Sequence, residues 1–228
     1  MVEDFNFMNP VMKGFSVLIV AVLMVTAIGY IQVSLSDDDS SNPNNPNNTS
    51  GVVRVNHVDI FQDCLALDAN HVVAAEDLSA GSPITCTIAT QPDVPRIFSW
   101  ILTHAQITEY TMVFVGVDAK GNVTNETVTE ADGWTGETDN AFAKITSVTF
   151  TRDAGTGAGD TLDVGIADKL GLSNPFTVAA DVYKVKEGGA DYTDFTVDAT
   201  YHTVSIDGVI GAWSDYTIWF RTNLTISS

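Results

Sequence analysis

Basic residues are scarce in this chain of 228 residues. Ten Lys and Arg stand against 29 Asp and Glu, so the formal net charge is −19 at pH 7. Such a surplus of negative charge repels phosphate groups and anionic lipid headgroups, which argues against nucleic-acid binding by an ordinary folded surface. It favours solubility in a salty exterior, while acidic loops also supply the oxygen ligands that Ca²⁺ prefers.

The sequence also lacks the motifs that accompany catalysis. It contains neither a Gly-x-Ser-x-Gly motif nor a P-loop, and its histidines show no metal-binding spacing. The histidines are His57, His71, His104 and His202. Because an enzyme site needs several groups in defined roles, we predict that the protein is not an enzyme and uses no cofactor.

Cysteine is nearly absent as well, with only Cys64 and Cys86 in the chain. The pair shows neither a C-x-x-C motif nor Cys/His spacing, which excludes zinc and redox-catalytic sites. In an extracellular domain such a pair favours one disulfide, whereas in a cytosolic domain two buried thiols are more common. Because the N-terminal apolar run and its flanking charges predict that the domain lies outside the cell, we expect a disulfide.

Against these absences stands a long apolar run near the N-terminus. Residues 15–33 read FSVLIVAVLMVTAIGYIQV and contain no charged side chain. As a helix this run would span about 28 Å, close to the ~30 Å of a bilayer's hydrocarbon core. We therefore predict a hydrophobic transmembrane or filament-core helix over residues 15–36. Lys13 precedes the run and acidic residues 37–39 follow it, which favours an N-inside, C-outside orientation.

The residues that precede this run carry a family resemblance. Residues 12–16, Met-Lys-Gly-Phe-Ser, followed by an unbroken apolar helix, resemble the processing site of type IV pilin-like proteins. In that family a peptidase cuts after a glycine that follows a basic residue, and the helix then packs with its copies into a filament core. The resemblance implies that Lys13 and Gly14 end a leader, residues 1–14, and that Phe15 becomes the N-terminus.

One position departs from the bacterial pattern of this family. Bacterial members usually carry Glu at the fifth mature position, where this chain has Ile19. Archaeal pilins and archaellins often lack that Glu, so the resemblance points to an archaeal pilin-like or archaellin-like surface protein. The alternative is a plain single-pass anchor that keeps residues 1–14 as a cytoplasmic segment.

A polar linker separates the apolar run from the rest of the chain. Residues 37–51 are dominated by Asp, Asn, Ser and Pro, which cannot bury apolar surface, so we expect a flexible hydrated spacer. Sequons for N-glycosylation begin at Asn48, Asn122, Asn125 and Asn223. Such sequons arise by chance in chains rich in Asn and Thr, but in an exterior domain they predict glycan attachment.

Beyond residue 51 the hydrophobic period changes to two. Runs such as residues 111–117, 145–151 and 216–220 are rich in β-branched and aromatic residues and are separated by Gly-containing turn signals. They predict one extracellular all-β domain over residues 52–228, a single sandwich or jelly-roll-like fold. Residues 97–110 fit a short helix or a strand pair equally well, and residues 167–172 suggest one helical turn.

A glycine tract at residues 155–159 interrupts the strand pattern and reads as a long hairpin loop. Asp153, Asp160 and Asp163 flank it. Carboxylates around flexible glycine could wrap a Ca²⁺ ion, and a solvated acidic loop is the alternative.

Two functions follow from these features. The first is a cell-surface structural protein that self-associates into a filament through residues 15–33, with the β domain on the exterior. The second is a membrane-anchored virion or envelope protein whose helix stays in the bilayer and whose β domain serves as a capsid, decoration or receptor-contact surface.

Overall fold

The computed structural model describes residues 31–33, 51–103, 106–131, 133–208 and 210–226. These residues form three antiparallel β-sheets, with two short 3₁₀ segments, η1 (Leu78–Ala80) and η2 (Ala179–Asp181), between strands. The predicted all-β class is therefore confirmed. Among the described residues no helix is long and apolar enough to cross a membrane.

The strands are distributed over the sheets as follows. Sheet 1 has the order β1 (Ile31–Val33), β2 (Gly51–Cys64), β15 (Ser214–Ile226), β11 (Val182–Glu187) and β12 (Ala190–Tyr192). Sheet 2 has the order β13 (Phe195–Asp198), β14 (Thr203–Ile206), β10 (Thr161–Gly171), β5 (Arg96–Thr103) and β8 (Thr135–Glu137), with β3 (Asp68–Asp77) also paired to β10. Sheet 3 has the order β4 (Ile84–Thr85), β9 (Lys144–Gly155), β6 (Ile107–Val117) and β7 (Val123–Ala131).

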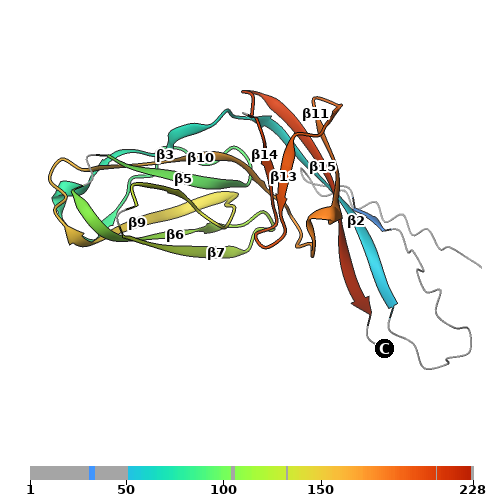
Figure 1. Cartoon of the computed structure of the whole chain (residues 1–228), viewed down its shortest axis with the longest axis horizontal. Helices are drawn as coiled ribbons and strands as arrows, with labels where there is room; N and C mark the ends of the chain where they lie inside the picture. Colours follow the sequence, from blue (N-terminus) through green and yellow to red (C-terminus); the bar gives the residue numbers. More distant parts are fainter. Residues whose placement is uncertain (1–30, 34–50, 104–105, 132, 209, 227–228) are drawn as a thin grey trace, which may run out of the picture.

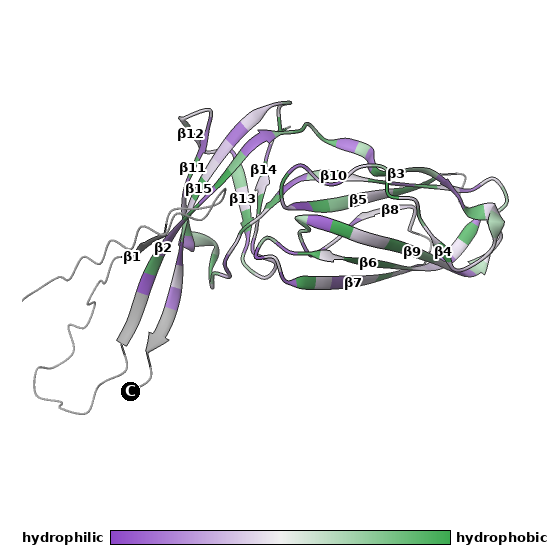
Figure 2. Ribbon diagram, turned by 180° about the vertical axis from the view of Figure 1, so that it is seen from behind, coloured by the Kyte–Doolittle hydropathy of each residue, from purple (hydrophilic) through white to green (hydrophobic). Residues whose placement is uncertain are grey.

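Sheet 3 and the part of sheet 2 formed by β3, β5, β8 and the first half of β10 face each other and make a distal lobe (Figure 1). Alternate residues of β6, among them Tyr110, Met112 and Phe114, are buried in its core. The Phe98 and Phe142 rings stack there with centroids 5.3 Å apart. Green stretches on β5 and β9 in Figure 2 mark the same apolar interior. Period-two burial of this kind is what the sequence pattern predicted.

A proximal lobe is formed where sheet 1 packs on β13, β14 and the end of β10. Along β15 the side chains of Tyr216, Ile218 and Phe220 are buried in a second core, together with Phe61 of β2 and Val204 of β14. The expected single pair of sheets is therefore too simple, because the domain has three sheets and two hydrophobic cores.

Strand β10 holds the two lobes together. Its residues Leu162, Val164 and Ile166 belong to the distal core, whereas Leu170 belongs to the proximal core. The same strand pairs with β3 and β5 through its first half and with β14 through its last three residues. One continuous strand thus crosses both lobes, which fixes them as one elongated body (Figure 1).

Both ends of the described body lie at the proximal lobe. Strands β2 and β15 pair from Cys64 opposite Ser214 down to Gly51 opposite Ile226, so the chain enters and leaves this ladder at one end. Strand β1 adds to the other edge of β2, with Ile31 opposite His57 and Val33 opposite Val55. The distal lobe therefore projects away from the point where the N-terminal segment joins.

Several local expectations can now be compared with the structure. The predicted strands at residues 111–117, 145–151 and 216–220 are confirmed within β6, β9 and β15. Within the ambiguous range 97–110, residues 97–103 belong to β5 and residues 107–110 begin β6. The predicted hairpin at residues 187–191 is confirmed too, with Gly188 and Gly189 at φ +54° and +86° at its tip, values that favour glycine.

Three local predictions were wrong. Residues 167–171 are strand rather than a helical turn, because β10 continues there to pair with β14. The glycine tract at residues 155–159 is not a hairpin, since it joins β9 of sheet 3 to β10 of sheet 2. Ile31–Val33, the last part of the predicted apolar run, is strand β1 rather than helix.

The other N-terminal predictions lie outside the described residues. These are the helix over residues 15–30 and 34–36, the processing residues Lys13, Gly14 and Phe15, most of the linker, and the sequon at Asn48.

Candidate functional site

The three aspartates of the predicted calcium loop serve separate parts of the backbone. Asp160 is fully buried, and its Oδ2 accepts hydrogen bonds from the amides of Gln106 (2.7 Å) and Ile107 (2.9 Å), while its Oδ1 has no partner among the described residues. Asp163 accepts from the amide of Ala75 at 2.7 Å.

The remaining aspartate, Asp153, accepts from the Thr111 hydroxyl at 2.8 Å. The described residues contain no group of three His, Cys, Asp or Glu that could hold a metal ion. The structure therefore does not bring Asp153, Asp160 and Asp163 together as a calcium site. Asp160 and Asp163 act as acceptors that fix the segments beside β10, and Asp153 links β9 to β6 within sheet 3.

The cysteines correct the predicted disulfide. Cys64 and Cys86 are both free and buried, and they lie in different cores, Cys64 in the proximal lobe and Cys86 in the distal lobe. Burial raises the pKa of each thiol to about 12. Because the thiolate is the reactive form, these side chains act as inert apolar groups in the cores.

The sequon asparagines that the structure describes are all exposed. Asn122 lies in the turn between β6 and β7, where it contacts Asp118, and Asn125 lies on β7, the edge strand of sheet 3. Asn223 lies on β15 opposite Arg54 of β2. Exposure is what attachment of a glycan requires, so the prediction stands for these three positions.

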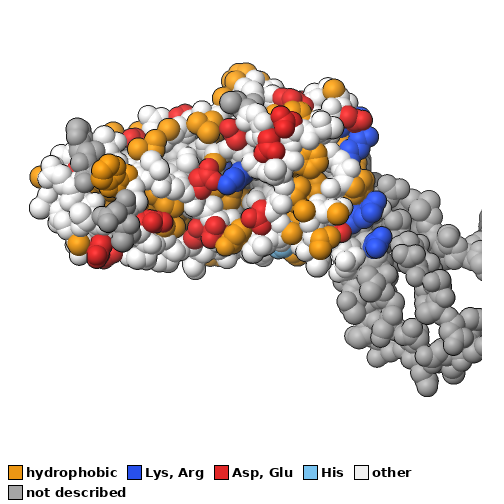
Figure 3. Space-filling view, in the orientation of Figure 1, with side chains coloured by type: hydrophobic (Ala, Val, Ile, Leu, Met, Phe, Trp, Pro, Cys, Tyr) orange, Lys and Arg blue, Asp and Glu red, His pale blue; other side chains and the backbone are white. Residues whose placement is uncertain are grey.

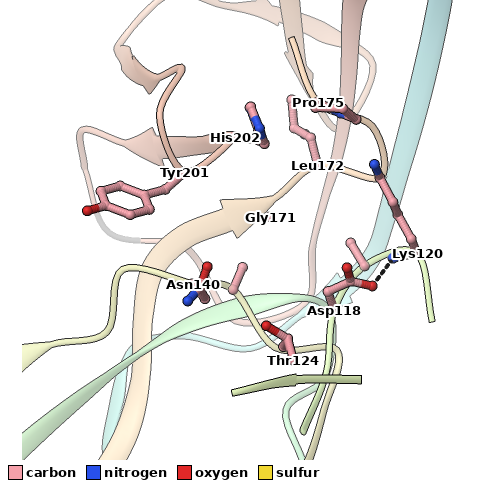
Figure 4. Close-up of a pocket in the computed structure, with 11 residues that line it drawn as sticks. Asp118, Lys120, Thr124, Asn140, Gly171, Leu172, Pro175, Tyr201 and His202 are labelled. Carbon is pink, nitrogen blue, oxygen red and sulfur yellow. Dashed lines mark hydrogen bonds between the residues drawn. The ribbon is translucent and has the colours of Figure 1, made fainter. Parts of the chain in front are cut away.

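Two of the histidines lie near the junction of the lobes. Figure 4 shows a small pocket there, with Asp118, Thr124 and Asn140 on its distal side and Tyr201 and His202 opposite. Its volume is about 130 Å³, and organic-ligand pockets are typically about 300–1,000 Å³. Burial, with a smaller effect of Lys120, lowers the pKa of both His202 and His57. A few waters fit this pocket.

A surface that the sequence reasoning did not identify covers the outer side of sheet 1. Residues that alternate with the buried ones on β2, β11 and β15 point away from the proximal core. We call this the outer face of sheet 1, and its members are Arg54, Val58, Ile60, Tyr183, Lys184, Lys186, Trp219 and Arg221. The Arg221 guanidinium lies 4.4 Å from the centroid of the Tyr183 ring, and the Lys184 ammonium 5.7 Å from that of Trp219.

The outer face of sheet 1 is positively charged in a strongly acidic protein. It carries four of the chain's ten basic residues, and its acidic neighbour is Asp191 of β12, 3.3 Å from Lys184 and 3.9 Å from Lys186. The local charge is thus 4 − 1 = +3. Figure 3 shows Lys and Arg gathered mainly at this end, with Asp and Glu scattered over the rest of the visible surface. In the sequence, the alternation of Lys184, Val185 and Lys186 already indicated a strand that buries Val185 and presents both lysines on its opposite face.

Comparison of the chain with protein-family models, with curated proteins and with solved structures gave no match in any of the three cases.

Proposed function

We propose that this protein is a structural subunit of the cell surface, a pilin-like protein that polymerises through its apolar residues 15–33. Its sandwich-like β domain would then form the exterior of the assembly. The resemblance of residues 12–16 to a pilin processing site motivates this proposal.

One structural observation carries the proposal further. The N-terminal residues join the proximal lobe at Ile31, which pairs with His57, and the β2–β15 ladder ends on the same lobe at Gly51 and Ile226, while the distal lobe extends from the opposite side of the proximal lobe. A subunit with its ends at one pole can place its N-terminal segments in a common core and its body outside. The small residues Ala21, Ala27 and Gly29 would allow close helix packing in such a core.

The N-terminus of the native protein tests this proposal. We expect mass spectrometry of the assembled protein to find a free Phe15. A Gly14→Glu variant should keep residues 1–14 and fail to assemble, whereas Gly121→Asn, in an exposed turn with φ +85° that Asn tolerates, should assemble normally. Assembled protein that begins at Met1 or Val2 would refute the processing step.

A second function, a membrane-anchored virion or envelope protein, is favoured by the outer face of sheet 1. Cations and aromatic rings at the pole where the N-terminal segment joins would suit a domain that stays beside a bilayer. Mild detergent distinguishes the two functions, because filaments survive it and a protein held in a bilayer is released as single subunits.

A further inference from the structure

We propose that the outer face of sheet 1 docks on the headgroups of a bilayer that contains anionic lipids. This inference rests on the second proposed function, in which the N-terminal apolar segment stays in a bilayer, and it does not depend on polymerisation. Three observations carry it: where the face lies relative to the N-terminal segment, which side chains it presents, and how charge is divided over the body.

The position of the face follows from strand pairing. Ile31–Val33 end the apolar run of the sequence and pair as β1 with β2, which also carries Arg54, Val58 and Ile60 of the face. No free spacer therefore separates the apolar residues before Ile31 from sheet 1. A segment inserted in a bilayer up to residue 30 would hold sheet 1 at the headgroup level.

The side chains match the chemistry of that level. Lys and Arg bind lipid phosphates, while Trp and Tyr prefer the interface because one end of the ring system is apolar and the other polar. Here Lys184 and Arg221 lie over aromatic rings, so cation and ring present one amphipathic surface. Tyr183 and Ile60 are 41% and 37% exposed and add apolar surface to this face.

The division of charge gives the domain an orientation. Residues 51–228 contain nine basic and 24 acidic residues, a net charge of 9 − 24 = −15, so the domain without the +3 face carries −18. Screening limits these fields to about 10 Å, so an anionic surface attracts the face without sensing the distal lobe. Orientations that turn the acidic remainder of the domain toward the headgroups are repelled.

The test uses the full-length protein in phosphatidylcholine vesicles, with and without phosphatidylglycerol, in which part of the phosphatidylcholine is brominated. Bromine quenches the fluorescence of nearby tryptophans. The readout is the part of this quenching that is lost when Trp219 is replaced by Phe. A Lys184→Glu/Lys186→Glu variant removes the charge of the face. Lys120→Glu/Lys144→Glu makes the same charge change at exposed residues of the distal lobe.

We expect Trp219-dependent quenching in anionic vesicles, little in neutral ones, and loss at high salt. The face variant should lower the ratio of docked to undocked domain by at least about fivefold per residue, and the distal variant should leave it unchanged. Equal quenching in neutral and anionic vesicles would overturn the inference. An equal loss of quenching in the face variant and the distal variant would overturn it too. Neither result would bear on whether Phe15 is the N-terminus of the assembled protein.

Two further outcomes separate this inference from the proposed function. Protein that does not float with neutral vesicles would contradict the membrane attachment and this inference together. Assembly lost only in the face variant, without any Trp219-dependent quenching, would show instead that the face binds a second copy of the chain, and would also overturn the inference.

Discussion

Arg96 is a buried cation at the junction of the two lobes, with its charge fully compensated. Its guanidinium donates to Asp93 at 2.7 and 3.1 Å, to the carbonyl of Ala167 in β10 at 3.1 Å and to that of Leu65 at 2.6 Å. Asp93 also accepts from the Leu65 amide at 2.6 Å. This network ties the connection between β2 and β3 to β10, so it fixes one lobe against the other.

Replacing Arg96 by Met should therefore destabilise the protein strongly. The change leaves the largely buried Asp93 carboxylate and two carbonyls without their donor, and breaking a buried pair in this way costs about 3–5 kcal/mol. Lys169→Met is the matched control, since Lys169 and Glu137 form an exposed pair worth about 1 kcal/mol or less. Urea unfolding measures both, and equal losses would contradict the assigned role of Arg96.

His57 should make the proximal lobe sensitive to acid. Its Nε2 lies 2.9 Å from the Thr222 hydroxyl and its Nδ1 lies 3.2 Å from the Asn174 amide nitrogen, so the neutral ring donates to one and accepts from the other. Burial, and to a smaller extent Lys120, lowers the pKa of His57 below its usual 6.5. As the pH falls below 6.5, the unfolded chain gains a proton that the folded one lacks, so the free energy of unfolding decreases.

An Asn174→Asp variant tests this prediction. A carboxylate beside Nδ1 would accept a hydrogen bond from protonated His57, so its pKa should rise and the acid-induced loss of stability should shrink. NMR titration of the ring gives the pKa, and urea unfolding at several pH values gives the stability. A pKa of His57 that is not depressed in the parent protein would contradict this account.

At the scale of the elements, strand β10 depends on a glycine at its centre. A Cβ atom added at Gly165 would overlap the carbonyl oxygen of Asp68 and the backbone of Ala69. Strand β3 approaches β10 here, and the register of their pairing shifts on both sides of Val164.

We expect Gly165→Ala to lower the free energy of unfolding by about 1–3 kcal/mol or more, because backbone must move to admit the methyl group. At Gly208 the nearest atom to an added Cβ is the flexible Tyr192 hydroxyl at 3.3 Å, so Gly208→Ala should have little effect. Thermal or urea unfolding measures the stability of the two variants against that of the parent protein. A Gly165→Ala protein as stable as the parent would show that β3 and β10 are not so closely packed.

Strands with strict alternation could be predicted from the sequence, whereas pairings that depend on distant residues could not. The runs within β6, β9 and β15 bury one face and show it in their period of two. The end of β10 reads ADKLGL, which contains good helix formers, yet it is a strand because β14 pairs with it and Leu170 enters the proximal core. Tertiary contacts therefore outweigh the local helix propensity in this segment.

For the sites, the composition could not indicate where on the surface the charges lie. A net charge of −19 indicated a surface that repels anionic partners, but a sum over the chain carries no information about position. Pairing of β2, β11 and β15 places Arg54, Lys186 and Arg221, which are far apart in the sequence, on one face of sheet 1. Similarly, the spacing of Cys64 and Cys86 could not reveal that they belong to two different cores.

At the scale of the whole molecule, the two lobes should differ in glycan occupancy. Asn122 and Asn125 lie on the distal lobe, away from the outer face of sheet 1, and should carry glycans in native material. Asn223 lies on the outer side of β15 opposite Arg54, where lipid headgroups would hinder attachment. Glycopeptide mapping measures the three sites, and full occupancy of Asn223 would contradict the docking of this face.

The central claim concerns assembly, and electron microscopy of native material after mild detergent tests it most directly. A pilin-like subunit predicts filaments that persist, with an apolar helical core and elongated two-lobed bodies on the outside. Release of the protein as single subunits in detergent micelles, with no filament before or after treatment, would contradict polymerisation and favour a bilayer-anchored envelope protein.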